Sequence, residues 1–399
     1  MMDILTLDDL DLDNLEGVPT LVRVDFNVPL EGGKVMDDTR LRAALPTLRE
    51  LKAAGARLLL MSHRGRPKGE VNLDFSLRPV AVALGELLEE DVAFAEDCVG
   101  QSARDQLQML EPGRVCLLEN LRFHPGETTN DPGFASRLAE LGEVYVNDAF
   151  GTAHRAHASV VGVAERIERK AAGRLMVNEV VALGSLLGEP ERPFTAIVGG
   201  AKISDKVATV SNLLDRLDIL VLGGGMANTF LASLGYDLAD SLVENDKLDL
   251  ARDILQRAEA ADIRIIVPSD LVVTDDLDNP QTIETVAAGE VPEGFKAVDI
   301  GEQARIAIRE ALEGSKTVLW NGPMGVFEKP PFDAGTVAVA QALAECDGFT
   351  VVGGGETVAA VRRAGVADRV SHISTGGGAS LEFLAGKPLP GLVALEKKS

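Results

Sequence analysis

Two lysines follow a glycine pair in the middle of the chain, in the stretch Phe194-Thr195-Ala196-Ile197-Val198-Gly199-Gly200-Ala201-Lys202-Ile203-Ser204-Asp205-Lys206. The apolar run predicts a strand, the glycines a tight turn, Ser204 a helix cap, and the residues from Val207 to Leu217 a helix. Glycines let backbone N–H groups approach a ligand, a helix N-terminus favours anions, and lysines four residues apart can share a helical face. The stretch therefore indicates a phosphate site, although one such turn alone also fits an ordinary strand–helix connection with solvated lysines.

A second set of charged and polar side chains follows apolar runs in the first half of the chain. Its members are Asp25, Asn27, His63, Arg66, Arg122 and Arg155, with Arg40 opening a predicted helix from Arg40 to Ala54. Any one of these arginines could form a surface salt bridge. Several arginines at equivalent strand ends repel one another, however, and need an anionic guest. We therefore expect a small phosphorylated or carboxylated ligand.

Both sets need a scaffold that gathers loop residues at one edge of a sheet. In the first half, apolar runs occupy residues 20–27, 57–61, 115–118 and 144–146, and helical patterns separate them. This alternation predicts buried parallel strands in an α/β fold. Ligands of such sheets bind beyond the carboxyl ends of the strands, where the charged residues stand.

The second half repeats the strand pattern, but its strands end in glycines. Apolar runs at 219–222, 317–320, 350–352 and 372–375 lead into Gly223-Gly224-Gly225, Asn321-Gly322-Pro323, Gly353-Gly354-Gly355-Glu356-Thr357 and Gly376-Gly377-Gly378. Such turns let the backbone lie close to a nucleotide and its phosphates. The sequence contains no G-x-x-x-x-G-K-[ST] motif, and no G-x-G-x-x-G follows a strand, which argues against a P-loop and a Rossmann dinucleotide site.

The length of 399 residues exceeds one core of typical size and predicts two domains. A helical pattern near residues 175–187, followed by glycine and prolines, suits an inter-domain connector. The expected fold class is α/β, with two doubly wound parallel-sheet domains facing each other across a cleft and joined by a connecting helix.

Composition limits the partners. The chain carries 39 basic and 62 acidic residues, a net charge of −23, which argues against nucleic acid and anionic membranes as partners. An acid-rich surface with about twice as many arginines as lysines suits work in high salt, although an ordinary acidic enzyme also fits. No apolar run spans a membrane and the N-terminus is acidic, so we expect a cytoplasmic protein. Cys98, Cys116 and Cys346 form no Cys/His cluster of metal spacing and are predicted to be buried thiols.

Seven motifs in order carry a family resemblance over essentially the whole chain. They are Arg23-Val24-Asp25-Phe26-Asn27-Val28-Pro29, Ser62-His63-Arg64-Gly65-Arg66-Pro67, Leu118-Glu119-Asn120-Leu121-Arg122-Phe123, Asn147-Asp148-Ala149-Phe150-Gly151-Thr152-Ala153-His154-Arg155, Gly199-Gly200-Ala201-Lys202, Trp320-Asn321-Gly322-Pro323-Met324-Gly325-Val326-Phe327-Glu328 and Ser374-Thr375-Gly376-Gly377-Gly378-Ala379-Ser380. With these motifs the chain resembles the phosphoglycerate kinases. The resemblance implies reversible phosphoryl transfer from 1,3-bisphosphoglycerate to MgADP, giving 3-phosphoglycerate and ATP.

The resemblance also implies a two-domain monomer with divided roles. Residues 1–172 would bind phosphoglycerate, and residues 388–399 would return to that domain. Residues 173–387, including the connecting helix, would bind ADP or ATP with Mg²⁺, and no tightly bound organic cofactor is expected.

The family's site residues carry over to matching positions of this chain. The resemblance implies that phosphoglycerate is bound by Asp25, Phe26, Asn27, Arg40, His63, Arg64, Gly65, Arg66, Arg122 and Arg155. It implies that the nucleotide is bound by Gly200, Ala201, Lys202, Lys206, Gly224, Asn321, Glu328, Gly354, Gly355, Glu356 and Thr357, with Glu328 on the ribose. Arg40 and Lys202 would be catalytic, Gly376 and Gly377 would support the transition state, and Glu356 would be the candidate Mg²⁺ ligand.

Three positions depart from the family pattern. Glu356 stands where the family usually has Asp, so its contact to magnesium or nucleotide is in doubt. Arg64 replaces a usual Leu, and Asn178 replaces a usual Lys. Two other classes of function stay open: an inactive nucleotide-binding or scaffolding protein, which would tolerate loss of the arginines, and a kinase of another acyl phosphate such as acetyl phosphate, which would need fewer of them.

Overall fold

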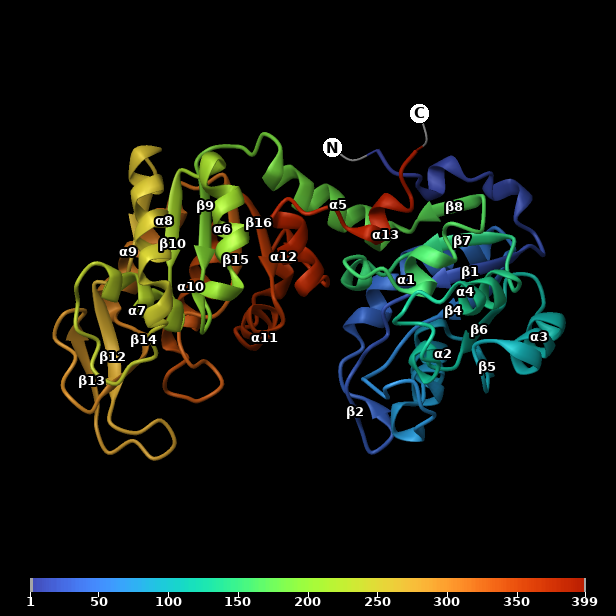
Figure 1. Cartoon of the computed structure of the whole chain (residues 1–399), viewed down its shortest axis with the longest axis horizontal. Coiled ribbons are helices and arrows are strands. Elements are labelled where there is room, and N and C mark those ends of the chain that lie inside the picture. The colour runs from blue at the N-terminus through green and yellow to red at the C-terminus, as the bar shows by residue number, and fades with distance from the viewer. Residues whose placement is uncertain (1–2, 398–399) are drawn as a thin grey trace. The chain divides into compact units, whose positions relative to one another are not determined.

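The computed structural model describes residues 3–397, which form two compact units. The first unit contains the chain up to Val181 together with the segment from Pro388, and the second contains Ala182–Lys387. The boundary falls inside helix α5 (Arg174–Leu187), which fits the predicted connector pattern (Figure 1). None of the helices in the described part of the chain combines the length and the apolar character that a membrane span needs.

The first unit is built on a parallel six-stranded sheet of order β5-β6-β4-β1-β7-β8. Its strands are β1 (Pro19–Arg23), β4 (Arg57–Met61), β5 (Ala93–Ala95), β6 (Val115–Leu118), β7 (Val144–Asn147) and β8 (Arg169–Ala172). Strand β1 is buried along its whole length, as expected for a central strand covered on both faces. The predicted runs form β1, β4, β6 and β7, whereas β5 and β8 were not predicted.

Helices connect these strands and bury a common core. They are α1 (Thr39–Ala53), α2 (Arg78–Leu88), α3 (Gly100–Met109) and α4 (Pro132–Ala139), with α13 (Pro390–Val393) near the C-terminal end. Helix α4 begins with Pro132 after Asp131, whose side chain accepts a hydrogen bond of 2.7 Å from the Phe134 backbone. The C-terminal segment is tied to the unit by the Gly391 amide, which donates to the Ala153 carbonyl at 2.8 Å.

The second unit repeats the architecture with strand order β11-β10-β9-β15-β16-β17, all parallel. The strands are β9 (Phe194–Val198), β10 (Ile219–Leu222), β11 (Arg264–Ile266), β15 (Thr317–Asn321), β16 (Phe349–Gly353) and β17 (His372–Ile373). The helices are α6 (Val207–Leu213), α7 (Gly224–Ser233), α8 (Leu248–Ala260), α9 (Glu302–Glu313), α10 (Ala334–Glu345), α11 (Gly355–Arg363) and α12 (Gly378–Leu384). Strand order reverses between β9 and β15, which makes the end of these two strands the switch point where doubly wound sheets bind ligands. The predicted α/β class with two parallel sheets is therefore confirmed.

Smaller antiparallel pieces complete the two units. Strands β12 (Asp270–Thr274), β13 (Ile283–Ala287) and β14 (Lys296–Ile300) form a three-stranded sheet in the second unit, and β2 (Leu30–Glu31) pairs with β3 (Lys34–Val35) in the first. None of these strands was predicted. Strand β13 is mostly exposed and so shows no continuous apolar run.

Three local predictions are wrong. Ser204 caps no helix, because its hydroxyl donates to Glu244 at 2.7 Å and α6 starts after Lys206. Lys202 and Lys206 precede α6, so they share no helical face, and α6 ends at Leu213 before a 3-10 turn. Cys346 is only half-buried, whereas Cys98 and Cys116 are buried as expected.

Candidate active site

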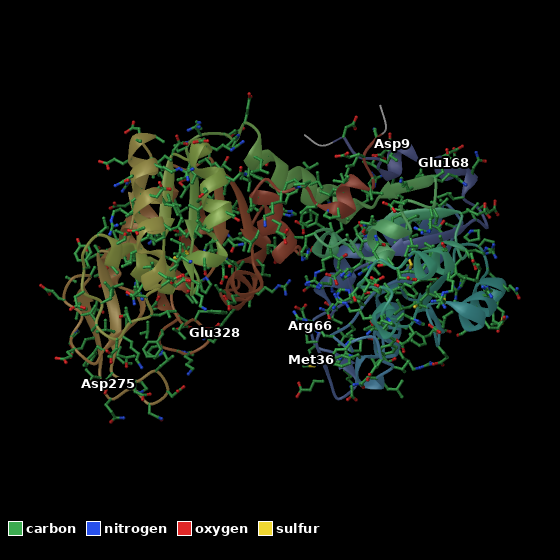
Figure 2. The ribbon with its side chains drawn as sticks, viewed as in Figure 1. Asp9, Met36, Arg66, Glu168, Asp275 and Glu328 are labelled. Carbon is green, nitrogen blue, oxygen red and sulfur yellow. The ribbon has the colours of Figure 1, made fainter. Side chains whose placement is uncertain are left out.

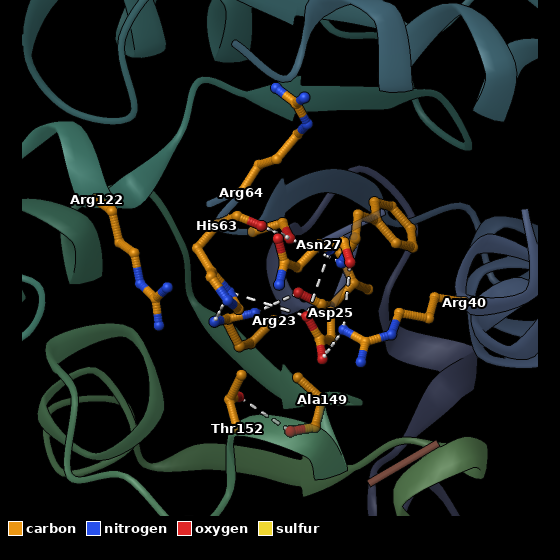
Figure 3. A network of polar contacts seen from close by, with 12 residues as sticks. Arg23, Asp25, Asn27, Arg40, His63, Arg64, Arg122, Ala149 and Thr152 are labelled. Atoms are coloured by element: carbon orange, nitrogen blue, oxygen red, sulfur yellow. Dashed lines mark hydrogen bonds and ion pairs between the residues drawn. The ribbon is translucent and has the colours of Figure 1, made fainter. Parts of the chain in front are cut away.

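The carboxyl ends of the parallel strands in the first unit carry the predicted charged residues, and Figure 3 shows Asp25, Arg40, His63 and Arg122 among them. Asp25 follows β1, His63 follows β4, Arg122 follows β6 and Arg155 follows β7, while Arg40 lies in the first turn of α1. The pKa of the buried His63 is held well below its usual range by desolvation and by the charges of Arg23, Arg122, Arg155 and Arg40. The charges of these guanidinium groups therefore act on one imidazole.

Arg23 belongs to this cluster, and its role was not predicted. It is the last residue of β1 and is fully buried. Its Nε donates to the Ser159 hydroxyl at 2.9 Å, and its Nη2 lies 3.1 Å from His63 Nδ1. Ser159 in turn donates to Glu127 at 2.7 Å. Because a guanidinium only donates hydrogen bonds, His63 Nδ1 must be the acceptor, and the neutral ring carries its proton on Nε2. An arginine inside an apolar strand is the sequence signal that could have identified Arg23.

Arg40 contacts Asp25 with an N–O distance of 2.7 Å. The neighbouring acids at the start of α1 have other partners: Asp38 pairs with Arg42 at 2.8 Å, and Asp37 accepts the Thr39 amide at 2.9 Å. Pairing of Arg40 with Asp37 or Asp38 would have made it an ordinary surface residue. Its contact with Asp25 instead places it inside the cluster.

Arg122 shows the electrostatic state of the site most clearly. Burial, together with the nearby charges of Arg155 and Arg23, lowers its pKa to about 10, so it stays charged at pH 7. One terminal nitrogen donates to the Gly65 carbonyl at 2.7 Å, while the buried Nε has no hydrogen-bond partner among residues 3–397. A buried charged donor without a partner is costly, and an anion would satisfy it.

The remaining predicted residues of the first unit differ in how far their side chains are exposed. Asn27 is exposed, and its side chain accepts the Gly65 amide at 2.9 Å. Arg66 is exposed (Figure 2), whereas the Phe26 side chain is buried in the core.

Arg64 is not part of the cluster. Its Nε donates to the Val28 carbonyl at 3.4 Å, and its guanidinium lies 6.0 Å from the centre of the Phe75 ring. Figure 3 shows this side chain pointing away from Asp25 and His63.

In the second unit the switch point between β9 and β15 is built from backbone. The Gly199 amide donates to the Asn321 carbonyl at 3.0 Å, and the Gly200 amide donates to the Pro323 carbonyl at 2.9 Å. A Cβ on Gly199 would lie 2.2 Å from the Pro323 oxygen, so only glycine allows this approach. Gly224, with a left-handed φ of +63°, would place a Cβ 2.6 Å from the Gly200 oxygen.

Polar side chains border these turns. Lys206 donates to the Asn321 side-chain oxygen, and burial lowers the lysine pKa against the opposing effect of Glu356 and Asp205. The Asn321 amide nitrogen is buried without a hydrogen-bond partner among the described residues, so it is a further donor available to an anion. Thr357 accepts the Gly322 amide at 2.6 Å, which holds the turn. Lys202 is exposed.

A cavity of about 240 Å³ adjoins the switch point. The predicted residues that line it are Gly200, Ala201, Gly224, Glu328 and Glu356. Its apolar wall was not predicted and includes Leu242, Pro268, Leu271, Ala297, Val298, Ile300, Pro323, Met324 and Val326. Burial raises the pKa of Asp299, which also lines the cavity, to about 7. An apolar slot beside glycine turns suits a base next to a phosphate chain.

The last predicted residues follow strands β15, β16 and β17 of the second unit. Gly354 has a φ of +90° and precedes α11, whose first turn carries the exposed Glu356. Gly377, with a φ of +53°, precedes α12, and the Gly376 amide donates to the Ser374 hydroxyl at 3.2 Å. Glu328 is exposed at the end of the turn after β15 (Figure 2).

Known proteins resemble the chain over almost its whole length. The family model "Phosphoglycerate kinase" matches residues 7–387. Phosphoglycerate kinase from Moorella thermoacetica is 55% identical over 394 residues, covering 99% of both chains, and that from Pelotomaculum thermopropionicum is 51% identical over 385 residues, covering 96% of this chain and 98% of the relative. A solved structure of phosphoglycerate kinase from Coxiella burnetii superimposes with a TM-score of 0.88 at 39% identity, covering 98% of both chains. The chain therefore belongs to the phosphoglycerate kinase family.

Proposed function

We propose that the chain catalyses reversible phosphoryl transfer between the acyl phosphate of 1,3-bisphosphoglycerate and MgADP, giving 3-phosphoglycerate and MgATP, as in glycolysis and gluconeogenesis. Family membership supports the reaction. The observation that carries the assignment of sites is the set of arginines whose charges act on the buried His63, in which the buried Arg122 keeps an unpartnered donor. Such a cluster fits a small ligand with both a phosphate and a carboxylate.

In this proposal the first unit binds phosphoglycerate. Arg122, Arg155 and the exposed Arg66 neutralise its anionic groups, and Asn27 and Asp25 accept its hydroxyl. His63, neutral at pH 7, donates from Nε2. The bound carboxylate is already ionised, so in the direction of ATP consumption its oxygen attacks the γ-phosphorus without a general base. Catalysis then consists of alignment and charge neutralisation, with Arg40 on the transferring group.

The second unit binds MgADP or MgATP in the same proposal. The apolar cavity holds the base, Glu328 reaches the ribose, and the turns at Gly200 and Gly224 let backbone amides face the phosphates. Lys202, Lys206 and the Asn321 amide add positive charge and hydrogen bonds. Gly376 and Gly377 offer backbone amides to the phosphoryl group in transfer. Magnesium enters with the nucleotide, and Glu356 is the acidic side chain that suits it.

Transfer between ligands on different units requires that the two ligands meet. We therefore propose closure about α5 when both substrates are bound, in a cytoplasmic monomer. Small-angle scattering should show a smaller radius of gyration with both ligands than with either alone. An unchanged radius would contradict the closure.

The net charge of −23 supports a further proposal, adaptation to high salt. The Debye length grows from about 3 Å at 1 M ionic strength to about 30 Å at 0.01 M, so repulsion among acidic groups reaches across the surface in dilute buffer. We expect the melting temperature and activity to fall after dialysis into dilute buffer. If melting temperature and activity were both unchanged in dilute buffer, the protein would be an ordinary acidic enzyme without salt adaptation.

The reaction itself is tested by a coupled assay with MgATP and either 3-phosphoglycerate or acetate. We expect turnover with 3-phosphoglycerate alone. Turnover with acetate in its place would indicate another acyl-phosphate kinase. Nucleotide binding without turnover of either acceptor would indicate an inactive nucleotide-binding protein.

A further inference from the structure

Three side chains with different metal-ligand chemistry meet in the first unit, outside the residues assigned to either substrate. Asp97 and Cys98 follow β5, and His124 follows the 3-10 turn after β6. Because β5 and β6 are paired in parallel, their carboxyl ends bring these segments together. One ligand atom from each side chain lies within 4.8 Å of the other two, and Asp97 Oδ1 is 2.6 Å from His124 Nε2.

The three side chains differ in how far they are exposed to solvent. The Cys98 side chain is fully buried, while the side chains of His124 and Asp97 are 26% and 44% exposed. The His124 ring stacks on Phe134, with centroids 5.0 Å apart, which fixes its orientation. The sulfur of Cys98 thus lies at the buried side of the cluster, and His124 and Asp97 lie at the side that is open to water. Three protein ligands with one position left for water is the arrangement of an open zinc site.

We propose that Asp97, Cys98 and His124 bind a transition-metal dication of the zinc class. A thiolate with an imidazole favours zinc or cobalt over magnesium or calcium, which prefer oxygen ligands. Binding replaces the thiol hydrogen of Cys98 by the metal and releases one proton to solvent. Coordination needs a His124 Nε2 that carries no proton. The ion would also fix the turn that carries Arg122, two residues before His124.

Local spacing in the sequence did not reveal this cluster, because pairing of β5 with β6 creates it. The spacing of the cysteines along the sequence shows no Cys/His cluster, whereas the fold brings Cys98 close to His124. The simpler interpretation is that Asp97 and His124 only hydrogen bond to each other. That interpretation predicts no thiolate–metal contact.

Cobalt(II) titration of the full-length, chelator-treated protein tests the proposal. We expect one equivalent to produce the near-ultraviolet charge-transfer band of a cobalt–thiolate bond and the visible bands of a four-coordinate ion. Cys98→Ala should abolish the charge-transfer band. Cys116→Ala is the matched control, because Cys116 is equally buried but lies outside the cluster, and it should keep the band. Absence of the band in the wild type, or its survival in Cys98→Ala, would overturn the proposal.

A second variant covers the case in which Cys98→Ala fails to fold. In His124→Gln the amide can still donate to Asp97, but it is a poor ligand for zinc or cobalt. We expect cobalt affinity to fall at least tenfold, and unchanged affinity would equally overturn the proposal. Kinase activity of each variant, measured without added cobalt, shows whether the variant has folded. Kinase activity of the wild type tests the proposed reaction. If the wild type had no kinase activity, the proposed reaction would be contradicted, but the cobalt titration would still test the metal site.

Discussion

The two units use the same parallel-sheet scaffold but expose different chemistry at the carboxyl ends of their strands. In the first unit, the charges of several arginines act on the buried His63, and Arg23 is held in place by Ser159 and Glu127. In the second unit, the strand ends approach each other through glycine backbone, and few charged side chains take part. Under the proposed function, the first region recognises an anion by side-chain charge, and the second recognises phosphates by backbone shape.

The difference teaches where each site is vulnerable. Removing a guanidinium deletes charge but leaves the backbone of the first unit intact. Adding one methyl group to a turn of the second unit deletes no charge but pushes apart the backbone segments that form the site. Substitutions of opposite kinds should therefore be damaging in the two units.

The largest effect is expected for Arg40→Ala. The proposal places Arg40 at the phosphoryl group that is being transferred. Its loss should therefore weaken stabilisation of the transition state more than binding of either ground state. We expect kcat to fall by about 10² to 10³, the scale for one preorganised donor, with small changes in both KM values. Steady-state kinetics with both substrates is the measurement.

Arg42→Ala is the matched control for this variant. Arg42 lies in the same helix but pairs with Asp38 at the surface, with 61% of its side chain exposed. Such pairs contribute about 0 to 1 kcal/mol to stability, and kcat should stay near normal. Equal kinetics for the two variants would remove Arg40 from the catalytic residues.

A smaller effect is expected for Gly224→Ala. The left-handed backbone costs a residue with a side chain about 1 to 2 kcal/mol, and the added Cβ meets the Gly200 backbone at 2.6 Å. We expect the KM for the nucleotide to rise about tenfold or more and the phosphoglycerate KM to change little. Gly314→Ala is the control, because a Cβ there meets nothing within 4 Å. A rise confined to the phosphoglycerate KM would contradict the division of roles between the units.

The smallest effect is expected for Glu356→Gln. Glu356 is exposed at the start of α11, near Lys206, so loss of its charge should weaken magnesium–nucleotide binding by a few-fold. The KM for MgATP and the magnesium dependence should shift while the phosphoglycerate KM stays constant. If only the phosphoglycerate KM changed, Glu356 would have the wrong assignment.

Much of the fold could be predicted because its strands are strongly apolar. The predicted runs at 57–61, 115–118 and 219–222 match β4, β6 and β10 residue for residue. The exposed β13 could not be found in this way, since its burial pattern carries no strand period. Ser204 was misassigned as a cap because the competing partner, Glu244, is remote in the sequence.

The sequence by itself determined which residue types stand at the strand ends, because strand periodicity and glycine turns are local properties of the chain. The partners of those residues depended on the tertiary structure. Only the fold pairs Arg40 with Asp25, lets Arg64 donate to Val28 outside the cluster, and places Arg23 within hydrogen-bond distance of Ser159. It also builds the apolar wall of the cavity beside β9 and β15 and brings Cys98 next to His124. These contacts form between segments far apart in sequence, where sheet order and burial decide which side chains meet.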